Sequence, residues 1–241
     1  MRTKSLLFFL MIQLFACSSA ELQNPFKKIL GLGDGEELTS AQIGGGLKEA
    51  LELGITKGAE RLSKTDGYYT SAYKILLPEE AQVVANKLRG VPGFSDLEED
   101  IIMKINRGAE DAAKKAAPIF VQAITEMTFE DALGILMGAD TAATSYLKGA
   151  TYTNLYEAFN PVITESLDKF DARKVWGDAV NAYNKIPFTK KANPDLDDYV
   201  TTRALAGLFD MVVKEELNIR KNVNARPTDL LKKVFAKQDN K

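Results

Sequence analysis

Residues 127–148 read MTFEDALGILMGADTAATSYLK, and this stretch decides the fold. Thr128 is a residue type that caps the first turn of a helix, and acidic side chains follow it in that turn. Gly138 is expected to end this helix, and Asp140 to cap a second one directly afterwards. The predicted buried stripes are Leu133, Leu136 and Met137 in the first helix and Ala143, Tyr146 and Leu147 in the second. The sequence therefore predicts two amphipathic helices that meet at a tight corner.

A long helix is predicted before this corner, from Thr39 or Ser40 to about Lys64, because leucine and isoleucine repeat there at helical spacing. Small residues lie beside its apolar stripe at intervals of four, namely Gly46, Ala50, Gly54 and Gly58. The charged residues of this helix forbid insertion into a membrane. The small residues therefore predict a groove against which another helix packs closely.

Further helical patterns fill most of the remaining chain. A short apolar run at 73–77 is expected to be extended, and Pro78 then opens a helix. Ser95 and Glu98 predict a capping box for a helix with a buried stripe reaching Ala116, followed by a bend at Pro118. Other helices are expected from Thr151 or Thr153 with a kink at Pro161, from Asp171 to about 186, from about 198 to 221, and from about 228 to 235.

These patterns predict an all-α fold, a single multi-helix bundle or array of roughly eight to ten helices with at most a short extended pair. We divide the chain into three parts. Residues 1–17 form a signal peptide of the lipoprotein type, with cleavage after Ala20 as the alternative. Residues 18–40 form a flexible tether, and residues 41–238 form the helical domain.

The leader has a basic start, an apolar core and then small residues, as secretory signal peptides do. The sequence Leu14-Phe15-Ala16-Cys17 resembles the bacterial lipobox, in which the cysteine is acylated and becomes the new N-terminus. Phe15 is bulkier than is usual there. An ordinary small-x-small site ending at Ala20 is the alternative, and it would discard Cys17. We expect Cys17 to be the lipid attachment site, because the chain has a single cysteine and it stands where the lipobox requires it.

The composition restricts the chemistry of the folded part. The 241 residues contain no histidine, so the usual general base and the commonest metal ligand are missing. We predict no metal site and no cofactor. The net charge is −2, and none of the predicted helices carries a basic face, which disfavours binding to nucleic acid.

Polar groups within the apolar helices are the remaining site candidates. The first cluster is Asn106, Arg107 and Glu110, the second includes Asp131 and Asp140, and Arg226 with Asp229 is the third. Each also has a structural interpretation: Arg107 with Asp111 and Glu216 with Arg220 have the spacing of ion pairs along a helix, and the aspartates can cap helices.

The chain from about Leu47 to Ala236 resembles the bacterial family called domain of unknown function 4197. Several motifs carry the resemblance: Asn106-Arg107-Gly108-Ala109-Glu110, Met127-Thr128-Phe129-Glu130-Asp131-Ala132 with Gly138 and Asp140, Tyr183-Asn184-x-Ile186-Pro187-Phe188, and Ala225-Arg226-x-Thr228-Asp229-Leu230-Leu231. The resemblance implies an all-helical domain facing the periplasm, secreted or lipid-anchored, and it implies no activity.

The leading functional hypothesis is a non-enzymatic binding or scaffold lipoprotein of the bacterial cell envelope. Its expected partners are the membrane, through the lipid anchor, and either an envelope protein or a small apolar ligand. As the alternative location, the protein is soluble in the periplasm or is secreted. The alternative functions are a periplasmic hydrolase or lyase that uses carboxylates and arginine, and a carrier of an apolar ligand.

Overall fold

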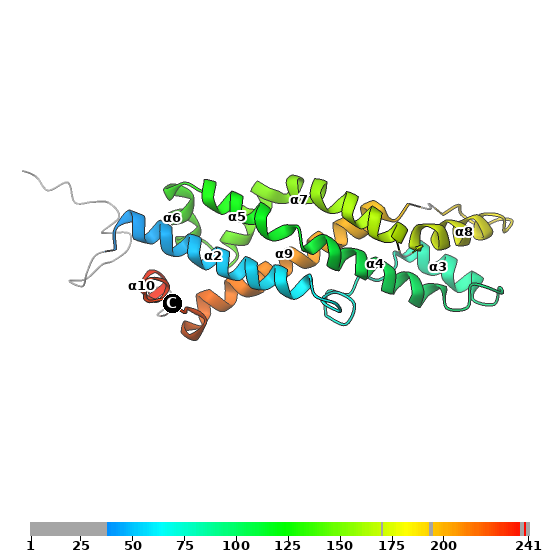
Figure 1. Ribbon diagram of the computed structural model, residues 1–241, viewed down its shortest axis with the longest axis horizontal. Helices are drawn as coiled ribbons and strands as arrows, with labels where there is room; N and C mark the ends of the chain where they lie inside the picture. The colour runs from blue at the N-terminus through cyan, green and yellow to red at the C-terminus, as the bar shows by residue number, and fades with distance from the viewer. Residues whose placement is uncertain (1–37, 170, 193–194, 237–238, 240–241) are drawn as a thin grey trace, which may run out of the picture. The chain divides into compact units, whose positions relative to one another are not determined.

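The computed structural model describes residues 38–241, except 170, 193–194, 237–238 and 240–241. The leader, Cys17 and most of the expected tether lie outside these residues. The described residues form helices α2 (Ser40–Leu62), α3 (Glu79–Leu88), α4 (Leu97–Ala113), α5 (Ala116–Glu126), α6 (Phe129–Met137), α7 (Ala142–Lys169), α8 (Ala172–Asn184), α9 (Asp197–Lys221) and α10 (Asp229–Phe235). They contain no strand, so the all-α prediction is confirmed (Figure 1).

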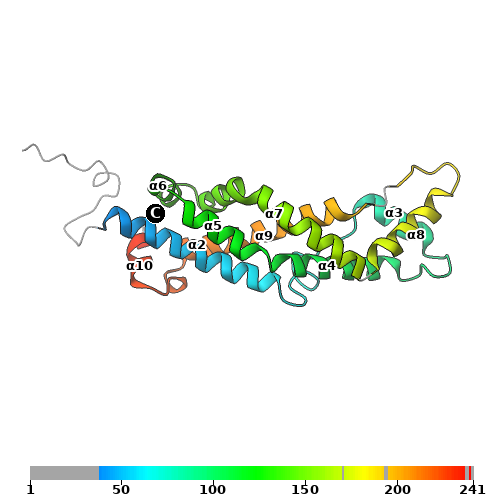
Figure 2. The same ribbon diagram turned by 45° about the horizontal axis from the view of Figure 1, so that its top comes forward.

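Helices α7 and α9 pack against each other, and α4 lies on α7 while α2 lies on α9 (Figures 1 and 2). The centre of this arrangement is apolar and contains aromatic side chains from several helices, among them Phe120, Phe159 and Trp176. The core buries residues from α2 to α10, so the described residues share one core. Of the helices described, none is both long enough and apolar enough to cross a membrane.

Helix α2 begins at a capping box between Thr39 and Gln42, as the start signal predicts. Its small residues meet other helices closely. A Cβ atom on Gly46 would lie 2.6 Å from Cγ2 of Val234 in α10, and one on Gly58 would lie 3.1 Å from Cγ of Met211 in α9. The prediction that the small residues receive other helices is therefore confirmed.

The corner at residues 127–148 forms, with two differences from expectation. Thr128 and Asp131 make a capping box for α6, and Gly138 follows its end. The buried residues of α6 are Ala132, Ile135 and Leu136, whereas Met137 is 39 % exposed. Of the predicted stripe, Leu136 is buried and Leu133 is half-buried, whereas Met137 was wrong, because the face with small Ala132 is the one that packs into the core.

The second helix of the corner is much longer than predicted. Helix α7 runs without a break from Ala142 to Lys169, so the expected new start at Thr151 or Thr153 was wrong. Thr151 is buried in the helix interior, where its hydroxyl donates to the carbonyl of Leu147 at 2.6 Å. A threonine that bonds to the carbonyl one turn earlier is compatible with a continuous helix. Pro161 lies inside α7, as predicted.

The segment around α4 and α5 also differs from expectation. The capping box at Ser95 does not form, because Asp96 occupies the N-cap position and the Ser95 hydroxyl donates to the Asp96 carboxylate. Helix α4 ends at Ala113 and α5 begins at Ala116. Pro118 therefore lies in the first turn of α5, where a missing backbone N–H costs nothing. The apolar run at 73–77 lies in turns and irregular chain between α2 and α3.

Candidate functional site

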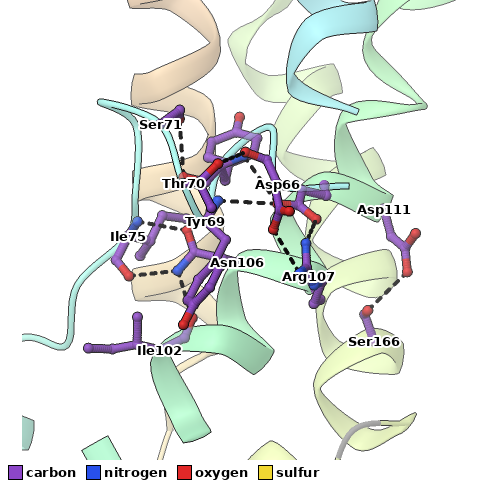
Figure 3. Close-up of polar contacts among 12 residues, drawn as sticks. Asp66, Tyr69, Thr70, Ser71, Ile75, Ile102, Asn106, Arg107, Asp111 and Ser166 are labelled. Atoms are coloured by element: carbon purple, nitrogen blue, oxygen red, sulfur yellow. Dashed lines mark hydrogen bonds and ion pairs between the residues drawn. The ribbon is translucent and has the colours of Figure 1, made fainter. Parts of the chain in front are cut away.

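The irregular chain between α2 and α3, residues 63–78, is held by polar side chains of α4, and we call it the clamped loop. Asn106 of α4 has no exposed surface. Its side-chain oxygen accepts from the N–H of Ile75 at 2.8 Å, and its side-chain nitrogen donates to the carbonyl of Ile75 at 2.8 Å (Figure 3). The same nitrogen donates to the carbonyl of Ile102 at 2.6 Å. Asn106 therefore replaces the backbone partners that a strand would give Ile75.

Glu110, one turn further along α4, holds the start of the clamped loop. Its Oε1 accepts from the backbone N–H groups of Tyr68 and Tyr69, both at 3.2 Å. Its Oε2 accepts from Arg107 at 2.7 Å, and Arg107 also donates to Asp66 at 2.8 Å. The carboxylate of Glu110 is 4 % exposed and has donors at both oxygens. Such a carboxylate is already occupied as an acceptor, which suits a structural role better than a catalytic one.

Tyr68 fixes the same loop to α9. Its hydroxyl donates to the carbonyl of Ala204 at 2.8 Å, and its ring is completely buried. Burial first, and the negative charge of Glu110 second, raise the pKa of Tyr68 above its ordinary value. The hydroxyl therefore stays protonated and keeps its role as a donor.

The clamped loop forms one wall of a surface groove of about 510 Å³, which we call the loop groove. The end of α2 and one face of α9 complete it. Its lining residues are Arg61, Lys64, Thr65, Asp66, Gly67, Thr70, Ser71, Ala72, Tyr73, Met211, Lys214 and Glu215. The lining mixes charged, hydroxyl and apolar groups: the loop contributes hydroxyls, Lys64 and Asp66, and the helices contribute Arg61, Met211, Lys214 and Glu215.

The loop groove is lined by three cations, Arg61, Lys64 and Lys214, and by two anions, Asp66 and Glu215. Asp66 is paired with Arg107, and Lys214 contacts the hydroxyl of Tyr73 at 2.7 Å and Asp210 at 3.1 Å. Arg61 and Lys64 are exposed, and neither forms an ion pair with any described residue. The groove can therefore accept negative charge from a ligand.

A second buried network lies at the corner between α6 and α7. Glu216 of α9 accepts from the N–H groups of Ala143 and Thr144, both at 2.9 Å. Arg220 donates to Glu216 at 3.0 Å and to the carbonyl of Ile135 at 2.8 Å. The Glu216–Arg220 ion pair was predicted from its spacing, but its burial and its contacts with α6 and α7 were not.

A third buried polar network is centred on Arg226, at the C-terminal end of α9. It has 1 % of its surface exposed and donates to the carbonyls of Ile219 and Arg220, each at 2.8 Å. It also forms two hydrogen bonds to Asp239, at 2.9 and 2.7 Å. The expected partner Asp229 instead contacts Lys232. Arg226 thus holds the last carbonyls of α9, where a cation is stabilised by the helix dipole.

The structure brings only some of the predicted site residues together. Asn106, Arg107 and Glu110 all act on the clamped loop, although Arg107 pairs with Glu110 and Asp66 and not with the expected Asp111. Asp131 and Asp140 lie instead at the corner between α6 and α7. Asp131 accepts from Thr128 in the capping box, and Asp140 pairs with Lys221 at 2.7 Å. Cys17 lies outside the described residues.

A small, mainly apolar cavity lies between α2, α7, α9 and α10, with Glu216 and Arg220 among its lining residues. Its volume is about 20 Å³. A cavity of that size holds about one water molecule. This cavity is too small for an apolar ligand.

Taken together, the described residues define an all-helical domain whose buried polar groups hold a loop and several helix ends. The chain belongs to the family described as "Protein of unknown function (DUF4197)", whose model matches residues 37–236. No curated protein and no solved structure matches the chain significantly. The family assignment made from the sequence motifs is therefore confirmed.

Proposed function

We propose that this protein is a non-enzymatic binding domain of the bacterial cell envelope, and that the loop groove binds an acidic segment of an envelope protein. The observation that carries the proposal is the clamp: Asn106 and Glu110, both buried, hold one irregular loop that forms a wall of the groove. Binding residues commonly lie on loops that a rigid scaffold positions. A fixed loop also lowers the entropy lost on binding.

The charge of the groove supports an acidic ligand. Arg61 and Lys64 pair with no described residue, and the lining as a whole has one more cation than anions. The hydroxyl group of Thr65 adds a donor on the loop side, whereas those of Thr70 and Ser71 already donate to the carbonyls of Asp66 and Tyr68. An open groove whose lining mixes charged, hydroxyl and apolar groups suits an extended peptide better than a purely apolar ligand.

The geometry gives less support to the hydrolase or lyase hypothesis. That hypothesis requires acids and an arginine that face one cleft. Arg107 and Glu110 bind each other and the clamped loop, whereas Asp131 and Asp140 each have a local partner at another corner. A turnover that is lost in Glu110→Gln, while the domain remains folded, would restore the enzymatic alternative.

The location at the envelope rests on the leader and on Cys17. An acylated Cys17 would carry a diacylglyceryl group on its sulfur and a second, amide-linked acyl chain on its amino group, which together meet the condition for stable anchoring. The acidic character of the chain also fits a protein that works away from nucleic acid. The domain would then be displayed on the periplasmic side of a membrane.

Site-specific photo-crosslinking in the native host tests the groove. The photoreactive residue p-benzoylphenylalanine is placed at Ala72, which is exposed and lines the groove, or at Val121, which is exposed on α5. We expect a discrete protein adduct from position 72, and its loss when Arg61→Glu and Lys64→Glu are introduced together. The same adducts from both positions, or an adduct that survives the charge reversal, would reject the groove as the binding site.

A further inference from the structure

The connection between α8 and α9 exposes an aromatic side chain completely. Phe188 is 107 % exposed, so it touches no other part of the described chain. Its backbone φ is 64°, in the left-handed region that residues with a bulky side chain rarely adopt. A large apolar group is thus held in water, in an unfavourable backbone conformation, without any packing contact that explains it.

The loop that carries Phe188 is closed by hydrogen bonds. The Asn184 side chain accepts from the N–H of Ala192 at 2.9 Å and donates to its carbonyl at 3.2 Å. Within the loop, the Thr189 hydroxyl donates to the carbonyl of Ile186 at 2.9 Å, and Lys191 donates to the carbonyl of Asn184. We call residues 185–191 the Phe188 loop. Its two ends are joined by these hydrogen bonds, so the backbone that carries the aromatic ring is held in place.

The charged residues within the Phe188 loop all have one sign. Lys185, Lys190 and Lys191 are exposed, and the sequence has no acidic residue between Asp178 and Asp195. An exposed aromatic ring flanked by lysines matches the chemistry of a phospholipid interface. The ring can enter the boundary of the acyl chains, and the ammonium groups can reach the phosphates.

We propose that the Phe188 loop is a contact site for an anionic phospholipid bilayer. A fluid bilayer can take up an exposed aromatic ring without a pocket of matching shape, so the isolated position of Phe188 suits a bilayer. The N-terminus of α2 and the Phe188 loop lie at opposite ends of the helical unit (Figures 1 and 2). The bilayer contact does not depend on the loop groove.

Vesicle co-sedimentation tests this site on the chain from Glu21 onward, which lacks the leader and Cys17. The probes are vesicles of phosphatidylglycerol and phosphatidylcholine in equal parts, and vesicles of phosphatidylcholine alone. We expect binding to the anionic vesicles and a loss of about tenfold or more in Phe188→Asn, because the ring no longer leaves water. The matched control is Val223→Asn, since Val223 is 46 % exposed and follows α9. It is expected to bind as the unsubstituted chain does.

The backbone conformation separates a binding defect from a folding defect. Asparagine tolerates the left-handed region better than phenylalanine, so Phe188→Asn is expected to melt at the same temperature or higher. Lys185→Ser with Lys190→Ser is expected to weaken binding to anionic vesicles about fivefold for each charge and to leave neutral vesicles unaffected. Equal binding by Phe188→Asn and the unsubstituted chain overturns the proposal. Absence of any binding to anionic vesicles also overturns the proposal, and a protein would then be the expected partner of Phe188.

Discussion

Glu216 and Arg220 stand one turn apart on α9 and hold the ends of two other helices. The carboxylate of Glu216 accepts from the N–H groups of Ala143 and Thr144 at the start of α7, and the guanidinium of Arg220 donates to the carbonyls of Ile135 and Leu136 at the end of α6. Each charge thus faces the helix end that its sign stabilises. The corner that decides the fold is closed by an ion pair from a helix more than 70 residues later in the chain.

Removing one member of this pair is expected to be costly. Glu216→Ala leaves the buried Arg220 without its counter-charge and leaves buried N–H groups without an acceptor. We predict a loss of about 3–5 kcal/mol in the free energy of unfolding, measured with urea. The neighbouring Glu215→Ala is the control, and a change within about 0.5 kcal/mol is expected there. Equal effects of the two substitutions would show that the corner does not depend on Glu216.

The clamp on the loop is tested at Asn106. Asn106→Ala leaves the N–H and the carbonyl of Ile75 buried without partners, and a loss of about 2–4 kcal/mol is expected. Hydrogen exchange at Ile75 and at the neighbouring loop amides should be faster in Asn106→Ala than in the unsubstituted protein. The increase should be larger there than in the core of α9. Asn181→Ala, at an exposed position of α8, is the control. Unchanged exchange at Ile75 in Asn106→Ala would contradict the clamp.

Two adjacent glycines of α2 give opposite predictions. Gly46→Ala places a Cβ atom 2.6 Å from Val234, and the resulting overlap is expected to destabilise the domain by about 1–2 kcal/mol after the gain in helix propensity. Gly45 has no atom within 4 Å of a built Cβ, so Gly45→Ala should stabilise the domain by about 0.5–1 kcal/mol. Thermal unfolding of the two variants measures the difference. Stabilisation by both would reject the close contact between α2 and α10.

The ion pair of Arg226 and Asp239 predicts a dependence of stability on acid pH. The hydrogen bond from Arg226 lowers the pKa of Asp239 below its ordinary value. A carboxyl group with a lowered pKa in the folded state contributes stability above its unfolded pKa of about 3.9, and that contribution is lost as the pH falls through the folded pKa. Asp239→Asn should therefore reduce stability at neutral pH and flatten its decline below about pH 4. An unchanged acid limb in urea titrations at several pH values would contradict the assignment.

Local signals predicted the fold class well. The capping residues Thr39 and Thr128 and the row of small residues in α2 appear in the structure as the sequence indicates. These features depend on residues close together in the chain, so their spacing is informative. The single long helix α7 was not predicted, because polar residues and a glycine near Thr151 resemble a start signal when tertiary contacts are unknown.

The site was predicted less completely, for a related reason. Asn106, Arg107 and Glu110 were recognised as polar residues on an apolar helix, but their partners in residues 66–75 lie more than 30 positions away. Glu216 and Arg220 have the spacing of an ordinary surface pair, and only packing reveals that they are buried. Tyr68 gave no signal, since its partner is a backbone carbonyl of α9.

The proposed lipid anchor on Cys17 would hold the domain at a membrane, and the mass of the mature protein tests that proposal most directly. The protein is purified from membranes of its native host beside a Cys17→Ser variant, and both intact masses are measured. We predict a chain that begins at Cys17 and carries the added mass of acyl groups, with membrane association and added mass both lost in the variant. An unmodified chain that begins at Glu21 and is recovered in the soluble fraction would contradict the lipid anchor.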